Sequence, residues 1–289
     1  MSEQWMAEWQ WLLSPWALGV LGLCIGSFLN VVIHRVPLIL ERQWKLDSAE
    51  MLGVASPAAD QIAPLSLSKP RSFCPACKTP IAWSANIPLF SYLALRGRCS
   101  ACGKPISLRY PMVEVACALL FALVAWRAGA QPVVLLWCGF VAALLALAGI
   151  DWDTTLLPDN ITLPLMWAGL VAAAMRWTIP LTDAVWGAIA GYLCLWSVYW
   201  LFKLATGKEG MGYGDFKLLA ALGAWLGVSM IVPIILAASV IGALVGIAMK
   251  LSQSLREGRY VPFGPFLAAA GVAVLLLGNE RVLGWLGWA

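Results

Sequence analysis

The sequence has little charge for its length. Only 12% of its 289 residues are charged, whereas soluble globular chains carry about 25%. In contrast, 61% are hydrophobic and the mean hydropathy is +0.81. A soluble globule cannot bury so much apolar surface, and disordered or coiled-coil chains need more charge or a repeat that is absent here. The composition indicates a protein of the lipid bilayer, and the small net charge of +4 implies no nucleic-acid partner.

Histidine is almost absent, because His34 is the only one. This excludes zinc proteases of the HExxH type, and a serine–histidine pair would depend on that one residue at the end of the first apolar run. No G-x-G-x-x-G fingerprint opens a strand–helix unit. Paired aspartates remain as the catalytic chemistry open to the chain.

Long uncharged runs predict an all-α polytopic fold of about eight transmembrane helices, because a span needs ~20 apolar residues. The run Leu218–Met249 contains 32 residues. As one helix it would extend about 48 Å, so we expect two spans with a break around Gly227, Ser229 and Pro233. The other predicted spans are Gln10–Ile33, Met112–Trp126, Gln131–Ile150, Ile161–Met175, Ala184–Phe202 and Phe263–Leu277.

Positive charge is concentrated on one side of these spans. Residues 34–110, 151–160, 203–217 and 250–262 hold 16 of the 19 Lys and Arg. The positive-inside rule therefore places these loops in the cytoplasm and both termini outside it. Glu3 and Glu8 precede the first apolar run, which is unlike the basic start of a cleaved signal peptide.

The first cytoplasmic loop contains two C-x-x-C pairs, Cys74 with Cys77 and Cys99 with Cys102. Each pair can present two thiolates to one tetrahedral ion, so we expect a structural zinc site. Iron in a rubredoxin-like site and two disulfides are the alternatives, and a reducing cytoplasm disfavours the disulfides. We expect the metal to supply much of the folding energy of this loop.

Four aspartates lie at the cytoplasmic ends of predicted spans, where an ionised carboxylate is costly to desolvate. Asp151, Asp153 and Asp159 follow the third span, and Asp215 ends Gly212-Tyr-Gly-Asp just before the sixth. Two carboxyl groups held close together share a proton, so one can act as general base and the other as general acid in peptide hydrolysis. We expect this role for Asp151 and Asp215, and an ordinary interfacial or helix-capping role for Asp153 and Asp159.

Together these motifs resemble the bacterial prepilin peptidase family over nearly the whole chain. The shared features are Gly26-Ser-Phe-Leu-Asn-Val-Val-Ile-His-Arg-Val-Pro37, the paired C-x-x-C loop with Asn86-Ile-Pro-Leu-Phe-Ser-Tyr and Arg96-Gly-Arg98, the segment from Asp151 to Asp159, and Gly212-Tyr-Gly-Asp215. The resemblance implies a bifunctional enzyme of the bacterial inner membrane, with its catalytic aspartates, Asp151 and Asp215, and its zinc loop at the cytoplasmic face. Such an enzyme removes the short basic leader of type IV prepilins and type II secretion pseudopilins, and then methylates the new N-terminal residue, usually Phe, from S-adenosylmethionine.

The resemblance suggests three regions: a first transmembrane helix in residues 1–33, a cytoplasmic four-cysteine loop in 34–110 as the methyltransferase region, and a peptidase bundle in 111–289. The residues that bind S-adenosylmethionine are not identified, although Glu114 and Arg98 mark a candidate site at the root of the loop. Alternatively, Glu114 is a buried partner of a nearby arginine.

Two other classes of function remain open. Intramembrane acids and helix-breaking glycines also suit an ion or substrate transporter, and a scaffold of the pilus or secretion assembly would need no activity. Cleavage of a prepilin distinguishes the three classes.

Overall fold

The computed structural model describes residues 10–53, 65–82, 87–252 and 261–288. Outside these residues lie Glu3, Glu8, Asn86 and most of the basic segment 250–262. Within them the regular structure is entirely helical, with two isolated β-bridges and no strand. The all-α fold class is therefore confirmed. The chain divides into two compact units, Met1–Val134 and Leu135–Ala289, and each is described by itself. The predicted boundaries at residues 33 and 110 stay a prediction.

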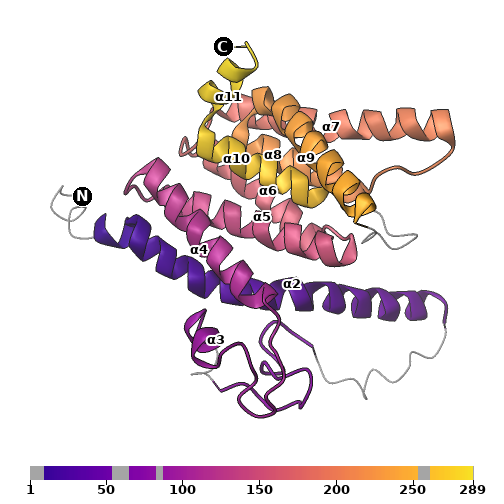
Figure 1. Cartoon of the computed structure of the whole chain (residues 1–289). Coiled ribbons are helices and arrows are strands. Elements are labelled where there is room, and N and C mark those ends of the chain that lie inside the picture. Colours follow the sequence, from indigo (N-terminus) through magenta and orange to yellow (C-terminus); the bar gives the residue numbers. More distant parts are fainter. Residues whose placement is uncertain (1–9, 54–64, 83–86, 253–260, 289) are drawn as a thin grey trace. The chain divides into compact units, whose positions relative to one another are not determined.

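In the first unit, a short 3₁₀ helix η1 (Gln10–Leu13) precedes the long helix α2 (Pro15–Met51), which packs against α4 (Arg109–Ala128). Figure 1 shows α2 continuing well past its crossing with α4. Gly22 and Gly26 make the close approach possible, because a Cβ at Gly22 would lie 2.7 Å from the Cα of Ala118. Small residues four apart are typical of packed helices in membranes.

The loop between these helices is held to α2 by one buried side chain. The guanidinium of Arg35 donates hydrogen bonds to the carbonyl oxygens of Ser66, Leu67 and Pro70, at 2.8 to 3.2 Å. A short helix α3 (Phe90–Ala94) follows in the same loop. Arg35 thus fixes the segment that leads into the first cysteine pair.

The second unit contains the remaining helices. They are α5 (Val134–Thr154), α6 (Asp159–Ala174), α7 (Leu181–Thr206), α8 (Tyr213–Leu226), the 3₁₀ turn η4 (Val228–Met230), α9 (Ile231–Leu251), α10 (Gly264–Leu277) and α11 (Asn279–Trp285). Helix α8 is buried on every side from Leu218 to Leu226 and contacts α6, α7 and α10 (Figure 1). A helix that is apolar all round forms the core of its unit.

Two residues anchor α8 in this core. The indole N–H of Trp225 donates to the carbonyl of Leu165 on α6, at 2.8 Å, and its ring packs on Phe140 of α5 with 4.9 Å between ring centroids. Gly223 meets Gly187 of α7 so closely that no Cβ fits at either residue. The position of α8 is therefore tightly fixed along its length.

All eight predicted spans coincide with a helix, but not all have the length of a span. By length and apolar composition, five helices of the described chain can cross a membrane, or six if α10 and α11, bent by 104°, count as one. Helices α6 and α8 have only 16 and 14 residues. The five long apolar helices mark a multi-pass membrane protein. The break predicted in Leu218–Met249 is confirmed, because α8 ends at Leu226 and Gly227 has φ +91°.

Candidate functional site

Asp151 and Asp215 lie near helix ends within the second unit. Asp151 is in the last turn of α5 and Asp215 in the first turn of α8, and both side chains are buried, at 4% and 7% exposed. Asp151 also acts electrostatically on Asp215, so the two carboxyl groups are within electrostatic reach of each other. The structure therefore brings together the two aspartates singled out from the sequence.

The N-terminus of α10 completes this arrangement. The backbone N–H of Gly264 donates to Oδ2 of Asp151, at 3.0 Å. This N–H belongs to the first turn of a helix, where no intrahelical acceptor exists. The positive end of a helix dipole stabilises a nearby carboxylate. Asp215, in the first turn of α8, is stabilised in the same way by the dipole of its own helix. Nothing in the local sequence around Gly264 indicated this contact, which joins residues 113 positions apart.

Leu157 sets the spacing of the backbone around the two acids. A Cβ at Gly214 would lie 2.7 Å from the Cβ of Leu157, and one at Gly264 would lie 3.2 Å from its Cδ1. The buried leucine side chain thus contacts both glycines, one beside each aspartate. Glycine is required at both positions because the backbone approaches this side chain directly.

Asp153 and Asp159 are exposed, unlike the buried pair. Asp159 forms an ion pair with Lys217 of α8, with 2.7 Å between Oδ2 and Nζ. The pair links α6 and α8. The expectation that Asp159 caps α6 is wrong, because the N-cap is Pro158 and Asp159 is the first helical residue. Its carboxylate is satisfied by a lysine distant in sequence instead.

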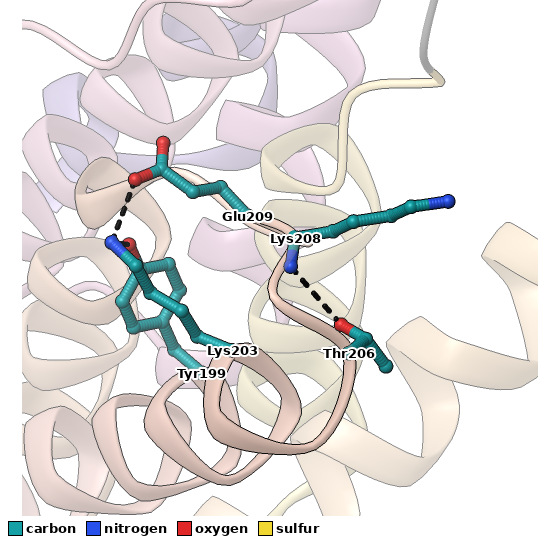
Figure 2. A network of polar contacts seen from close by, with 5 residues as sticks. All are labelled: Tyr199, Lys203, Thr206, Lys208 and Glu209. Atoms are coloured by element: carbon teal, nitrogen blue, oxygen red, sulfur yellow. Dashed lines mark hydrogen bonds and ion pairs between the residues drawn. The ribbon is translucent and has the colours of Figure 1, made fainter.

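A polar network holds the loop that leads from α7 into Asp215. Figure 2 shows Glu209 folded back onto the ammonium of Lys203, at 2.8 Å, while Lys208 points away. Lys203 also contacts the hydroxyl of Tyr199, at 3.2 Å. The hydrogen bond from Lys203 lowers the pKa of Glu209. The ring of Tyr199 packs on Tyr213, two residues before Asp215, with 5.2 Å between centroids. The network therefore connects the loop to the segment that carries this acid.

The four cysteines of the first unit converge on one point. Their sulfur atoms all lie within 4.8 Å of one another, with 3.9 Å between Cys74 and Cys102 and 4.0 Å between Cys77 and Cys99. Four sulfurs at ~2.3 Å from a tetrahedral ion are about 3.8 Å apart. The cluster could therefore hold a metal ion.

Each cysteine pair sits on the same kind of backbone turn. Cys74 donates its N–H to Thr79 and accepts from Lys78, and Cys99 likewise donates to Lys104 and accepts from Gly103, all at 2.9 to 3.0 Å. Lys78 and Gly103 both have positive φ, at +59° and +69°. The two matching turns aim their thiols at a common centre.

The cysteine thiols of this cluster differ in how readily they lose a proton. Hydrogen bonds from the side chain and backbone of Thr79 lower the pKa of the Cys77 thiol to about 6. A backbone hydrogen bond at Lys104 lowers the pKa of Cys102, but burial and the neighbouring thiols outweigh it and raise that pKa to about 11. Without a cation, the Cys77 thiol therefore ionises more readily than the Cys102 thiol, whereas a metal ion favours deprotonation of every thiol that binds it.

Glu114 and Arg98, the candidate methyltransferase residues, are not brought together. Arg98 is exposed, and no ion pair joins it to Glu114 in the described part of the chain. The interpretation of Glu114 as an arginine partner is also wrong. Its Oε2 accepts the backbone N–H of Leu89 instead, at 2.7 Å.

Two family models match the chain. The bacterial peptidase A24 N-terminal domain covers residues 20–128, and the type IV leader peptidase family covers residues 138–247, which include both buried aspartates. The chain belongs to the type IV leader peptidase family. No solved structure matches it.

Curated members of this family resemble the chain over most of its length. It is 51% identical over 274 residues to a protein of Stutzerimonas stutzeri, covering 93% of each chain, and 52% identical over 261 residues to one of Pseudomonas putida, covering 90% of each. A third, from Pseudomonas aeruginosa, is 50% identical over 274 residues, covering 93% of this chain and 92% of the other. All three are named prepilin leader peptidase/N-methyltransferase. The comparisons do not support the transporter alternative.

Proposed function

We propose that this protein is a prepilin leader peptidase and N-methyltransferase. In this proposal it cleaves the basic leader of type IV prepilins and type II secretion pseudopilins, and then methylates the new N-terminal residue, usually Phe. The observation that carries the peptidase half is the buried pair of Asp151 and Asp215 at adjoining helix ends in a family of leader peptidases. The enzyme would act in the bacterial inner membrane, with this pair and the cysteine cluster at the cytoplasmic face.

The pair can carry out hydrolysis by sharing one proton. The ionised carboxylate takes a proton from a water molecule as the water oxygen bonds to the scissile carbonyl carbon, and the protonated carboxyl gives its proton to the carbonyl oxygen. The carbon–nitrogen bond of the intermediate then breaks, and the amine leaves with a proton. The N-termini of α8 and α10 favour the ionised form that this cycle requires.

Replacing either aspartate with asparagine tests the peptidase assignment. Asp151→Asn and Asp215→Asn keep the shape of the side chain but remove its acid–base function, and each should lower the cleavage rate by several orders of magnitude. Asp153→Asn is the matched control, because this acid is exposed on the same helix as Asp151. Near-normal cleavage of a synthetic prepilin by Asp215→Asn would contradict the assignment.

We further propose that Cys74, Cys77, Cys99 and Cys102 hold one structural zinc ion. The 3.9 to 4.0 Å separations of the opposing sulfurs support this, and the ion would hold the four thiolates together and offset half of their charge. Elemental analysis of purified protein should give one zinc per chain, falling sharply in Cys74→Ser. Iron in place of zinc, or zinc content unchanged in this variant, would refute the assignment.

The methyl donor implied by this function is S-adenosylmethionine, whose sulfonium supplies an electrophilic methyl group. Methyl transfer requires the amine that cleavage releases, so Asp151→Asn should fail to methylate full-length prepilin. The same variant should still methylate a pilin supplied with its mature N-terminus. Transfer of labelled methyl to both substrates is the measurement, and loss of both transfers would show that the two activities share the aspartates.

A further inference from the structure

Glu114 on α4 is a buried carboxylate that peptide hydrolysis and metal binding leave unused. Its side chain is 7% exposed, and its one described hydrogen bond is the 2.7 Å contact from the N–H of Leu89. No lysine or arginine of the described segments pairs with it. A buried anion without a cation is costly, so this position suits a cation that arrives with a ligand.

The hydrogen bond to Leu89 does not by itself explain why position 114 carries an acid. Leu89 donates from a backbone with φ +58°, which a leucine rarely adopts. A neutral glutamine would accept the same N–H equally well, so holding Leu89 in place does not explain the negative charge. Gly26 of α2 packs directly on the backbone of Glu114, because a Cβ added at Gly26 would lie only 2.7 Å from the Cα of Glu114.

Polar and apolar groups flank this carboxylate. One turn before it on the same face of α4, the carbonyl of Tyr110 accepts a hydrogen bond from Asn30 of α2, at 3.1 Å. The tyrosine side chain itself is exposed, as is that of Phe90, which follows Leu89 and is 66% exposed. A buried anion with one exposed aromatic residue a helical turn away and another next to its hydrogen-bond donor suits a positively charged amine attached to an apolar residue.

We propose that Glu114 binds the new N-terminal ammonium group of the cleaved substrate and holds it for methylation. This inference rests on the proposed function, because hydrolysis of the leader creates that amine. The ammonium gives a proton to the carboxylate, and the freed nitrogen lone pair bonds to the methyl carbon as the carbon–sulfur bond of the donor breaks. A neutral thioether leaves, the product is a secondary ammonium, and the carboxyl proton passes to solvent.

Peptide binding to the whole protein in detergent, without a methyl donor, tests this site. The probes are a peptide that begins with a free Phe amine and the same peptide N-acetylated. The wild-type protein should bind the free amine about tenfold or more tightly than the acetylated form, because a charge-assisted hydrogen bond is lost on acetylation. Glu114→Gln should abolish this preference. Glu41→Gln should retain it, because Glu41 is an exposed acid on α2 paired with Lys45.

Cleavage and methyl transfer separate this inference from the proposed function. Glu114→Gln should cleave prepilin normally but raise the KM for methylating a pre-cleaved pilin. If the wild type prefers the free amine through Glu114 yet methylates nothing, the methyltransferase proposal fails and the ammonium site stands. If methylation proceeds and Glu114→Gln keeps the amine preference, the ammonium site is wrong.

A second measurement needs no variant and covers the case in which Glu114→Gln does not fold. A carbodiimide activates a carboxyl group, which then forms an amide bond with an amine that reaches it, so an amine bound beside Glu114 should couple there. Treatment of the wild-type protein with the free-amine peptide should form an amide bond at Glu114, identified by mass spectrometry, and the acetylated peptide should give none. Coupling only to other carboxylates, or to none, would overturn the proposal.

Discussion

The contact between Gly264 and Asp151 makes a specific prediction about Gly264→Ala. The new methyl group would lie 2.5 Å from Oδ2 of Asp151, whereas ordinary contacts of this kind begin at 3.4 Å. Either the carboxylate or the start of α10 must therefore move by about 0.9 Å. The 3.0 Å hydrogen bond from the Gly264 N–H to the same oxygen would be disturbed as well.

A displacement of this size predicts a large loss of activity with little loss of folding. Moving a catalytic group by ~1 Å can cost about a hundredfold in rate, so kcat for prepilin cleavage should fall about that much. KM should change little, since the substrate is not touched directly. Gly246→Ala on α9 is the matched control, because a Cβ there has no neighbour within 4 Å.

The assay is steady-state cleavage of a synthetic prepilin by both variants, with thermal unfolding in detergent to compare their stabilities. Gly264→Ala with kcat within threefold of the wild type would show that this backbone contact does not position Asp151. Equal losses in the Gly246→Ala variant would show that the effect is not specific to the acid.

Three further predictions concern other contacts. Trp225→Phe loses the buried hydrogen bond to Leu165 and should lower the free energy of unfolding by about 1 to 3 kcal/mol, seen as a lower Tm in detergent. Lys78→Gly relieves a positive φ in the first cysteine turn, so metal release to a chelator should be slower than in the wild type, and faster release would contradict the strain argument. Gly22→Val forces α2 away from the backbone of Ala118, so the variant should be cut by protease more readily than the wild type. A variant as resistant as the wild type would show that α2 and α4 can separate without cost.

The sequence predicted the helical architecture well where the signal was a long apolar run. Each predicted span became a helix, and the interruption at Gly227 was visible because glycine and a following proline stop a helix in an otherwise uncharged stretch. The four cysteines were also recognisable, because two C-x-x-C pairs leave few alternatives. Local patterns of this kind need no knowledge of distant contacts.

What could not be predicted depends on residues far apart in the chain. Helix α2 was expected to end at Ile33, where the uncharged run stops, but it continues through Pro37 to Met51. The pairing of Asp159 with Lys217 and the contact between Gly264 and Asp151 join separate helices. The partner of Glu114 is a backbone N–H, which any residue other than proline could supply.

The meeting of Gly187 and Gly223 has a consequence for genetic screens of this protein. A single added methyl group at either glycine already forces α7 and α8 apart, so a second at the other should add little, and the two defects should be strongly non-additive. Because α8 also carries Asp215, alleles at these glycines would mimic catalytic mutants while leaving both acids intact. Second-site suppressors would distinguish them: a distorted helix pair can be rescued by smaller neighbours elsewhere, whereas a missing acid cannot.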